Sequence, residues 1–239
     1  MTQRLNAAGV KSSDIEILFI THLHSDHVMD IYQLYISGWH QGRDKKFKII
    51  GPKGTKEFFH NILKAFDEEL QGRIKWEQRP NNKGLEFEVI EIDTSFKFKH
   101  FDLEVNPFEV DHYPVEPAFG YQIKFLDTGQ EKKVVISGDT RKSENLIEHS
   151  LDADALVHEV FVSLEFDEKR MSKETILNVS DYHTSPKEIG EIANIAKVKK
   201  LILTHFVPPI FDENELIANI EESYNGQIII GEDLMSIEI

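Results

Sequence analysis

Three histidines and one aspartate fall within six residues near the start of the chain, in the segment THLHSDH at 21–27. Neutral imidazole nitrogens and carboxylate oxygens are ligands that suit zinc, manganese and iron. In an extended segment, residues two apart point to the same side, so His22 and His24 can share one ion. The chain then turns, which lets Asp26 and His27 reach a neighbouring point. The segment therefore predicts a metal site rather than a polar turn that happens to be rich in histidine.

Three further candidates follow apolar stretches that are typical of strands. Asp139 comes shortly after KVVIS at 133–137, His205 directly after LILT at 201–204, and His112 after a stretch that ends near Val110. Taken singly, a histidine after a strand is often structural and an aspartate after Ser-Gly is often a turn residue. Ligand sites in sheet proteins gather at the carboxyl ends of strands. Together with the first segment, these residues predict a site for two metal ions.

The elements that must position these residues alternate between strands and helices. A nearly continuous apolar run at 15–21 is typical of a strand buried on both faces. Helical spacing follows at 28–36. A short strand at 47–50 precedes a helix for which Thr55 is the predicted N-cap.

The remaining pattern predicts a sheet-rich middle and a mixed end. Alternating strands are expected at 85–93, 96–102, 103–110 and 119–126, buried strands at 133–137, 155–158 and 201–204, helices at 144–150, 186–197 and 213–223, and closing strands near Ile228 and Ser236. Buried strands interleaved with helices indicate an α/β fold with two sheets between helix layers, an αββα sandwich. The absence of repeats and linkers favours a single domain over 1–239.

Composition limits the functions that the chain can have. The chain of 239 residues contains no cysteine, which excludes disulfides, thiolate metal sites and a cysteine nucleophile. Its net charge of −15 disfavours a nucleic-acid substrate, because phosphate neutralisation requires basic side chains. RNA would need a local basic patch, for which the candidates are Arg43, Lys45 and Lys46, or Lys197, Lys199 and Lys200. The sequence has neither an apolar run of ~20 residues nor an apolar signal core, so we expect a cytoplasmic protein without a membrane partner.

The pattern His-x-His-x-Asp-His, followed by isolated ligands at strand ends, resembles the metallo-β-lactamase fold superfamily. Within it, the chain is similar to the ribonuclease Z group and its arylsulfatase-like relatives, from near Thr2 to about His205. The resemblance rests on THLHSDH at 21–27, GPKGT at 51–55, FGY at 119–121, VVISGDTR at 134–141, LVHE at 156–159, YHTSP at 182–186 and LILTH at 201–205. It implies a metallo-β-lactamase-like α/β fold that is N-terminally short, because family members usually have earlier strands.

The resemblance also implies two divalent metal ions, with zinc preferred over manganese or iron. One ion would be held by His22, His24 and His112, the other by Asp26, His27 and His205, and Asp139 would bridge them. A hydroxide between the ions would be the nucleophile, because two cations lower its proton affinity. Asp26 would orient or deprotonate that water.

Two further residues match segments that assist the leaving group in ribonuclease Z relatives. These are Glu159, in a His-Glu segment, and His183, in a His-Thr segment. A carboxylate-supported imidazole is suited to donate a proton to a departing oxygen. The alternative is a purely structural hydrogen-bonded pair.

The chain departs from typical ribonuclease Z in two places. Between Tyr121 and Val134 it has room only for a turn, where bacterial members often carry a long arm that grips transfer RNA. The linker at 112–120 is longer than usual and is similar to the arylsulfatase-like branch. With the acidic charge, these features favour a two-metal hydrolase of a small phosphodiester or sulfate ester over a transfer-RNA 3′-processing endonuclease. A non-catalytic metal- or ligand-binding protein on the same fold remains the alternative from another class, and a homodimer is expected only by analogy with relatives.

Overall fold

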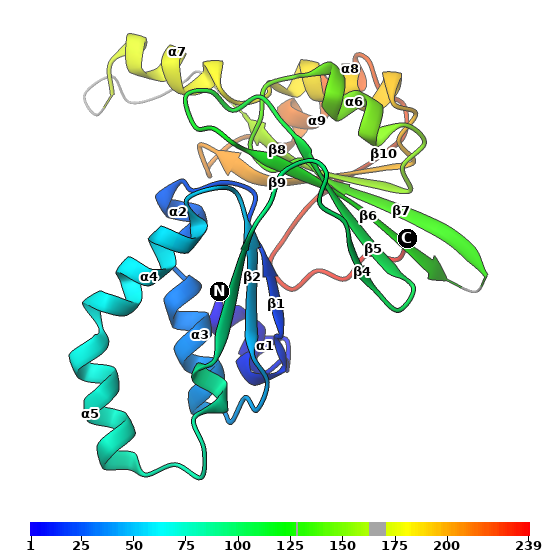
Figure 1. The fold of residues 1–239 in the computed structure, drawn as a ribbon. Coiled ribbons are helices and arrows are strands. Elements are labelled where there is room, and N and C mark those ends of the chain that lie inside the picture. The colour runs from blue at the N-terminus through cyan, green and yellow to red at the C-terminus, as the bar shows by residue number, and fades with distance from the viewer. Residues whose placement is uncertain (128, 163–170) are drawn as a thin grey trace. The chain divides into compact units, whose positions relative to one another are not determined.

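The computed structural model of the chain describes residues 1–127, 129–162 and 171–239. Its contacts divide the chain into two compact units, Met1–Ile92 and Asp93–Ile239. Each unit is built around one sheet with helices beside it (Figure 1). The mixed α/β class with two sheets flanked by helices is therefore confirmed, and the single domain over 1–239 stays a prediction.

The first unit contains a parallel sheet with strand order β1-β2-β3. Large apolar side chains such as Ile49 of β2, Leu34 of α3 and Phe59 of α4 are fully buried and form its core. The strands are β1 (Ile17–Phe19), β2 (Phe47–Gly51) and β3 (Phe87–Glu91); the helices are α1 (Thr2–Ala7), α2 (Ser25–Val28), α3 (Ile31–His40), α4 (Thr55–Ala65) and α5 (Asp67–Glu77), with short 3-10 turns η1 (Ser12–Asp14) and η2 (Lys83–Leu85).

Two local predictions for this unit need correction. The helix expected at 28–36 is two helices, α2 and α3, and α2 begins inside the histidine-rich segment. Thr55 is the first residue of α4 rather than its N-cap, and its hydroxyl donates to Pro52 O. The cap is Gly54, whose φ of +102° is a left-handed conformation that glycine adopts without steric cost. The Glu91 carboxylate of β3 accepts hydrogen bonds from the Gly54 and Lys56 amides, which satisfies the start of α4.

The second unit contains a seven-stranded sheet with order β10-β9-β8-β7-β6-β5-β4. Strands β4 to β7 pair antiparallel, whereas β7 to β10 pair parallel. The strands are β4 (Phe98–His100), β5 (Leu103–Glu109), β6 (Phe119–Asp127), β7 (Gln130–Ile136), β8 (Ala155–Phe161), β9 (Lys200–Val207) and β10 (Gln227–Ile230); the helices are α6 (Glu144–Ser150), α7 (Lys173–Asp181), α8 (Pro186–Ile195) and α9 (Glu213–Glu221).

Helices α6, α8 and α9 gather beside this sheet (Figure 1), and their apolar faces complete its core. Leu146, Ile189 and Ile220 come from these helices and are fully buried. Helix α8 begins with a capping box between Ser185 and Glu188 and has Pro186 in its first turn. Ser236, expected near a closing strand, lies outside the observed strands. Among the residues that the structure describes, no helix is both long and apolar enough to cross a membrane.

Candidate metal centre

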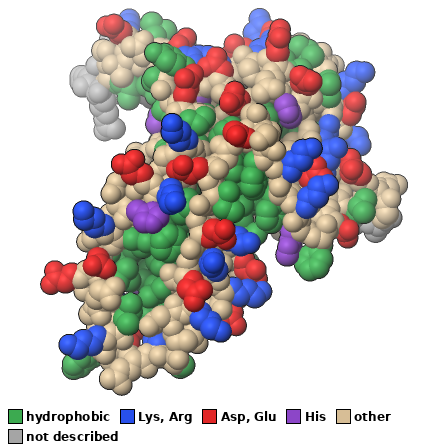
Figure 2. All heavy atoms as spheres, viewed as in Figure 1, with side chains coloured by type: hydrophobic (Ala, Val, Ile, Leu, Met, Phe, Trp, Pro, Cys, Tyr) green, Lys and Arg blue, Asp and Glu red, His purple; other side chains and the backbone are tan. Residues whose placement is uncertain are grey.

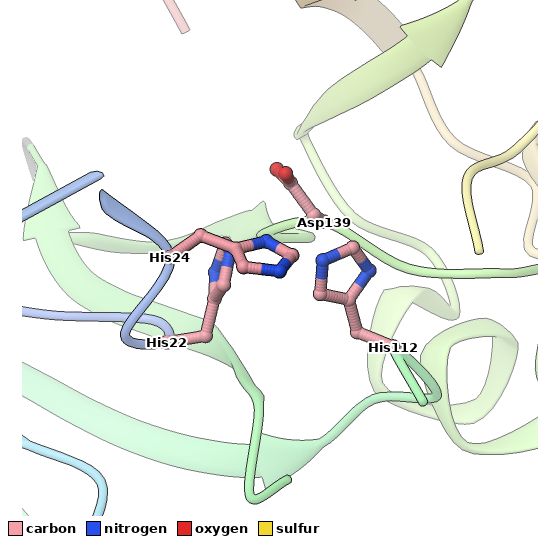
Figure 3. A group of neighbouring side chains, drawn as sticks. All are labelled: His22, His24, His112 and Asp139. Carbon is pink, nitrogen blue, oxygen red and sulfur yellow. The ribbon is translucent and has the colours of Figure 1, made fainter. Parts of the chain in front are cut away.

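In the first unit, the predicted ligands His22 and His24 lie on the chain that joins β1 to α2, and Asp26 and His27 lie in the first turn of α2. His24 has the extended conformation that the sequence predicted, with φ −61° and ψ 147°, and it forms the N-cap of α2. The Nε2 atom of the buried His22 lies 3.2 Å from Nδ1 of His24 (Figure 3). The Nε2 atom of His27 lies 3.5 Å from Asp26 Oδ2, and the Asp26 side chain is 66% exposed. The segment thus presents two pairs of donor atoms.

In the second unit, His112 lies just beyond β5 and is buried (Figure 3). Its Nδ1 donates to the carbonyl of Tyr182, with a separation of 2.8 Å. A ligating histidine commonly donates its other ring N–H to a backbone carbonyl, which fixes the tautomer and the ring orientation. The bond to Tyr182 therefore leaves Nε2 as the nitrogen with which His112 can bind a metal ion.

Asp139 follows β7 after a turn through Ser137 and Gly138, and Gly138 has a φ of +63°. The Asp139 side chain is buried, and its Oδ2 lies 3.5 Å from Nε2 of His205. A short turn with a left-handed glycine thus places this carboxylate at the end of the sheet beside a histidine from another strand.

His205 occupies a β-bulge, which the sequence did not indicate. It was expected directly after a strand that ends at Thr204, but β9 continues to Val207. Thr204 faces Glu159 of β8 and Phe206 faces Val160, so His205 is the extra residue in β9. Its φ of +47° is unusual for a residue other than glycine. Bulges of this kind redirect a side chain from its strand, and here the redirected imidazole meets Asp139.

Glu159 and His183 lie against each other in the same unit. Glu159 is buried on β8, and its Oε2 lies 3.1 Å from Nδ1 of His183. Its Oε1 accepts from the backbone amides of Thr140 at 3.3 Å and Thr184 at 3.0 Å. Burial, and secondarily the charge of Asp139, raises the pKa of Glu159 well above its ordinary value, whereas the two amide bonds act to lower it. The two amides thus hold one oxygen of this carboxylate in place, and the other oxygen faces the imidazole of His183.

The spacing of the donor atoms fits metal binding. Two ligand atoms on one tetrahedral zinc ion, each bonded at 2.0–2.1 Å, lie about 3.4 Å apart. The pairs His22–His24, Asp26–His27 and Asp139–His205 have separations of 3.2, 3.5 and 3.5 Å. The donors are imidazoles and carboxylates, which zinc, manganese and iron accept. A ring nitrogen of His183 also lies within 4.8 Å of the donor atoms of Asp139 and His205. His183 was not among the expected ligands.

Of the basic residues that the sequence suggested as an RNA-binding patch, one is buried and two have their charge paired with a carboxylate. Arg43 is only 3% exposed, and its Nη2 donates to the carbonyls of Tyr35 and Gly84 inside the first unit. Lys45 pairs with Glu16, and Lys199 lies 2.8 Å from Asp154. On the face drawn in Figure 2, acidic and basic side chains are interspersed.

Comparisons with known proteins identify the family of the chain and solved structures with a similar fold. Residues 2–206 match the family described as Beta-lactamase superfamily domain. The chain is 32% identical to ribonuclease Z of Mycobacterium sp. (strain KMS) over an alignment of 242 positions, which covers 99% of this chain and 82% of that relative. Two solved structures are similar: the metallo-beta-lactamase fold protein YhfI from Bacillus subtilis (TM-score 0.67, 19% identity, 94% of this chain and 78% of that one) and the short form of human tRNase Z (TM-score 0.63, 22% identity, 98% and 84%).

Proposed function

We propose a function for this chain, which belongs to the beta-lactamase superfamily and, within it, to the ribonuclease Z family. It is accordingly a metal-dependent hydrolase of ester bonds. The finer proposal is that the bond is a phosphodiester of RNA. This reverses the ranking from the sequence, in which the net charge, the short segment between Tyr121 and Val134 and the long linker at 112–120 placed a small ester ahead of RNA. The arylsulfatase-like branch, the homodimer and the cytoplasmic location stay predictions.

The observation that carries the proposal is the buried pair Glu159–His183, beside the candidate ligands Asp139 and His205. Cleavage of a phosphodiester requires a proton for the departing oxygen and stabilisation of negative charge on phosphorus. The ring of His183 lies 5.9 Å, centroid to centroid, from that of His205. An imidazole suited to acid–base catalysis and candidate metal ligands thus lie in one unit, which supports the proposal because a protein that only stores a metal would not need the imidazole.

We propose that the donors of both units bind the same two ions, as the resemblance implies. One ion would take His22, His24 and His112, the other would take Asp26, His27 and His205, and Asp139 would bridge them. The separations within the pairs support this assignment. When bound, two divalent ions polarise the phosphate ester and activate water as a nucleophile.

The remaining steps belong to side chains of the chain itself. Glu159 receives two backbone amides on one oxygen and faces His183 Nδ1 with the other, so it fixes the orientation of the imidazole. The opposite nitrogen, Nε2, then donates the proton to the departing oxygen. Asp26, which is largely exposed, orients the attacking water. These are the roles that we propose for the three catalytic residues.

A substrate panel tests the proposal. The zinc-loaded chain would be incubated with a precursor transfer RNA that carries a 3′ extension, the same RNA without the extension, bis-nitrophenyl phosphate and nitrophenyl sulfate. We expect one cut near the junction of the extension, slower hydrolysis of the phosphodiester and no attack on the sulfate. Hydrolysis of either small ester, the phosphodiester or the sulfate, with intact RNA would instead support the small-ester alternative.

Metal content, combined with the substrate panel, distinguishes a non-catalytic metal-binding protein from an RNA endonuclease and from a small-ester hydrolase. About two equivalents of metal per chain are expected, because the proposed site binds two ions. A chain that binds both ions but cleaves none of the four substrates would be a non-catalytic binding protein, contrary to the proposal.

A further inference from the structure

Arg141 lies two residues after Asp139 and contacts two other segments of the second unit. Its backbone amide donates to Asp111 O at 2.7 Å, and its Nη1 donates to Asp111 Oδ1 at 2.8 Å. Its Nη2 donates to Asp181 Oδ2 at 2.7 Å. One guanidinium thus links the segment after β7, the segment after β5 and the end of α7.

These contacts close a ring around the candidate ligand His112. Asp111 precedes His112, and Asp181 precedes Tyr182. The carbonyl of Tyr182 accepts the hydrogen bond from His112 Nδ1 at 2.8 Å. The path therefore runs from Arg141 through Asp111 to His112, across to Tyr182, and back through Asp181 to Arg141. The carbonyl that selects the tautomer of His112 is held in place by the residue next to it.

We propose that Arg141 is a positioning residue that keeps the loops of His112 and His183 in register with Asp139. It acts on His112 through the Tyr182 carbonyl, and on His183 because that residue follows Tyr182 directly. This inference deepens the proposed function of the same site and rests on it. It adds a residue that contacts neither the ions nor the reacting bond and yet determines how well the ions bind.

The chemistry of the side chain favours arginine here. The planar guanidinium offers donors in a fixed fork, so it can bind Asp111 and Asp181 at once in one geometry, whereas an ammonium is a single compact donor group. The partners Asp111 and Asp181 are 53% and 75% exposed. Exposed ion pairs contribute little to the stability of a fold. The effect of losing Arg141 should therefore appear in the metal site rather than in thermal stability.

The test compares R141A, R141K and D181N with the control R73A. Arg73 contacts two carboxylates, Glu69 and Glu77, on helix α5 of the first unit. Like Arg141 it therefore has two acidic partners, but it lies outside the ring around His112. Zinc affinity would be measured by competition with a chelator, and the tautomer of His112 by nitrogen NMR. We expect R141A to weaken zinc binding on the order of 10-fold, as loss of outer-shell support does, and to mix the tautomers of His112.

The variants give distinct outcomes. R141K should recover little of the affinity, D181N should show a smaller loss, and R73A should match the unaltered chain, with melting temperatures unchanged throughout. Unaltered zinc affinity and an unaltered His112 tautomer in R141A would overturn the inference, and full recovery by R141K would overturn the role of the fork. These measurements use no substrate. A failure of the chain to cleave RNA would therefore contradict the proposed function without deciding the role of Arg141.

Discussion

The two units present their candidate metal ligands in different ways. In the first unit, all four come from one segment, 22–27, and the donor atoms lie against each other in pairs. In the second unit, His112, Asp139 and His205 come from three segments of the chain, which the order of strands in the sheet brings together. In this second set, His112 also has a supporting contact from a backbone group of another segment, the carbonyl of Tyr182. Ligands that lie close together in the sequence can be recognised from the sequence alone. Ligands that are far apart in the sequence can be recognised as one group only when the order of the strands is known.

The largest expected effect tests whether the two sets serve one site. Asp139→Ala should remove most bound metal and nearly all hydrolysis, because its carboxylate is proposed to bridge both ions. Loss of metal stabilisation worth several kcal/mol corresponds to a rate decrease on the order of a thousand-fold or more. Metal content and single-turnover cleavage measure this. Turnover like that of the unaltered chain would separate the two sets and contradict the two-metal assignment.

The next effect distinguishes metal ligands from the acid–base pair within the second unit. His183→Ala should retain its metal but slow cleavage of a poor leaving group by ~10²–10⁴-fold, the usual contribution of general acid catalysis. An activated nitrophenyl ester should be slowed much less, because its leaving group needs no proton. Equal slowing of both substrates would show that His183 has no role at the leaving group, and loss of metal would make it a ligand.

A smaller effect concerns the interior of the first unit. Arg43→Met should lower the free energy of unfolding by about 2 kcal/mol, because it leaves the buried carbonyls of Tyr35 and Gly84 without their donor. Chemical denaturation measures this, with Lys45→Met as a control at an exposed position. If the free-energy cost of burying the guanidinium exceeds the stabilisation from its hydrogen bonds, the free energy of unfolding will instead rise, which would contradict a stabilising role for Arg43.

The smallest effect concerns the start of α8, which follows the loop that carries His183. Ser185→Ala should cost about 1 kcal/mol of stability, because the hydroxyl caps the Glu188 amide and anchors the capping box. Zinc affinity should not change. Ser172→Ala at the start of α7 is a matched control for a cap without a box. A drop in zinc affinity for Ser185→Ala alone would show that the helix start and the metal site are coupled.

Much of the fold follows from local pattern. Helix α6 has the predicted bounds, 144–150; Ser143 caps its start, and Leu146 is buried. Helices α5 and α7 were not predicted, since each buries little: only Leu70 of α5 and Ile176 of α7 are buried. With so few core-facing residues, the helical period is weak in the sequence.

In the candidate site, too, some features can be predicted from the sequence and others cannot. The types and spacing of the ligands are visible, as is the pair Glu159–His183. The amides of Thr140 and Thr184 that hold Glu159 are backbone groups, which every residue type has, so no sequence signal marks them. The contacts of Arg141 join residues 30 and 40 positions apart and depend on the sheet.

The bulge at His205 bears on how such a ligand can be gained or lost in evolution. Thr204 and Phe206 face consecutive residues of β8, so the ladder is continuous on either side of the extra residue. A one-residue deletion at this position would leave a regular strand and remove the candidate ligand, whereas substitution by alanine would keep the bulge and its left-handed backbone. An insertion would do the reverse. A single indel in one strand can thus separate a hydrolase from a relative that has the same fold but one ligand fewer.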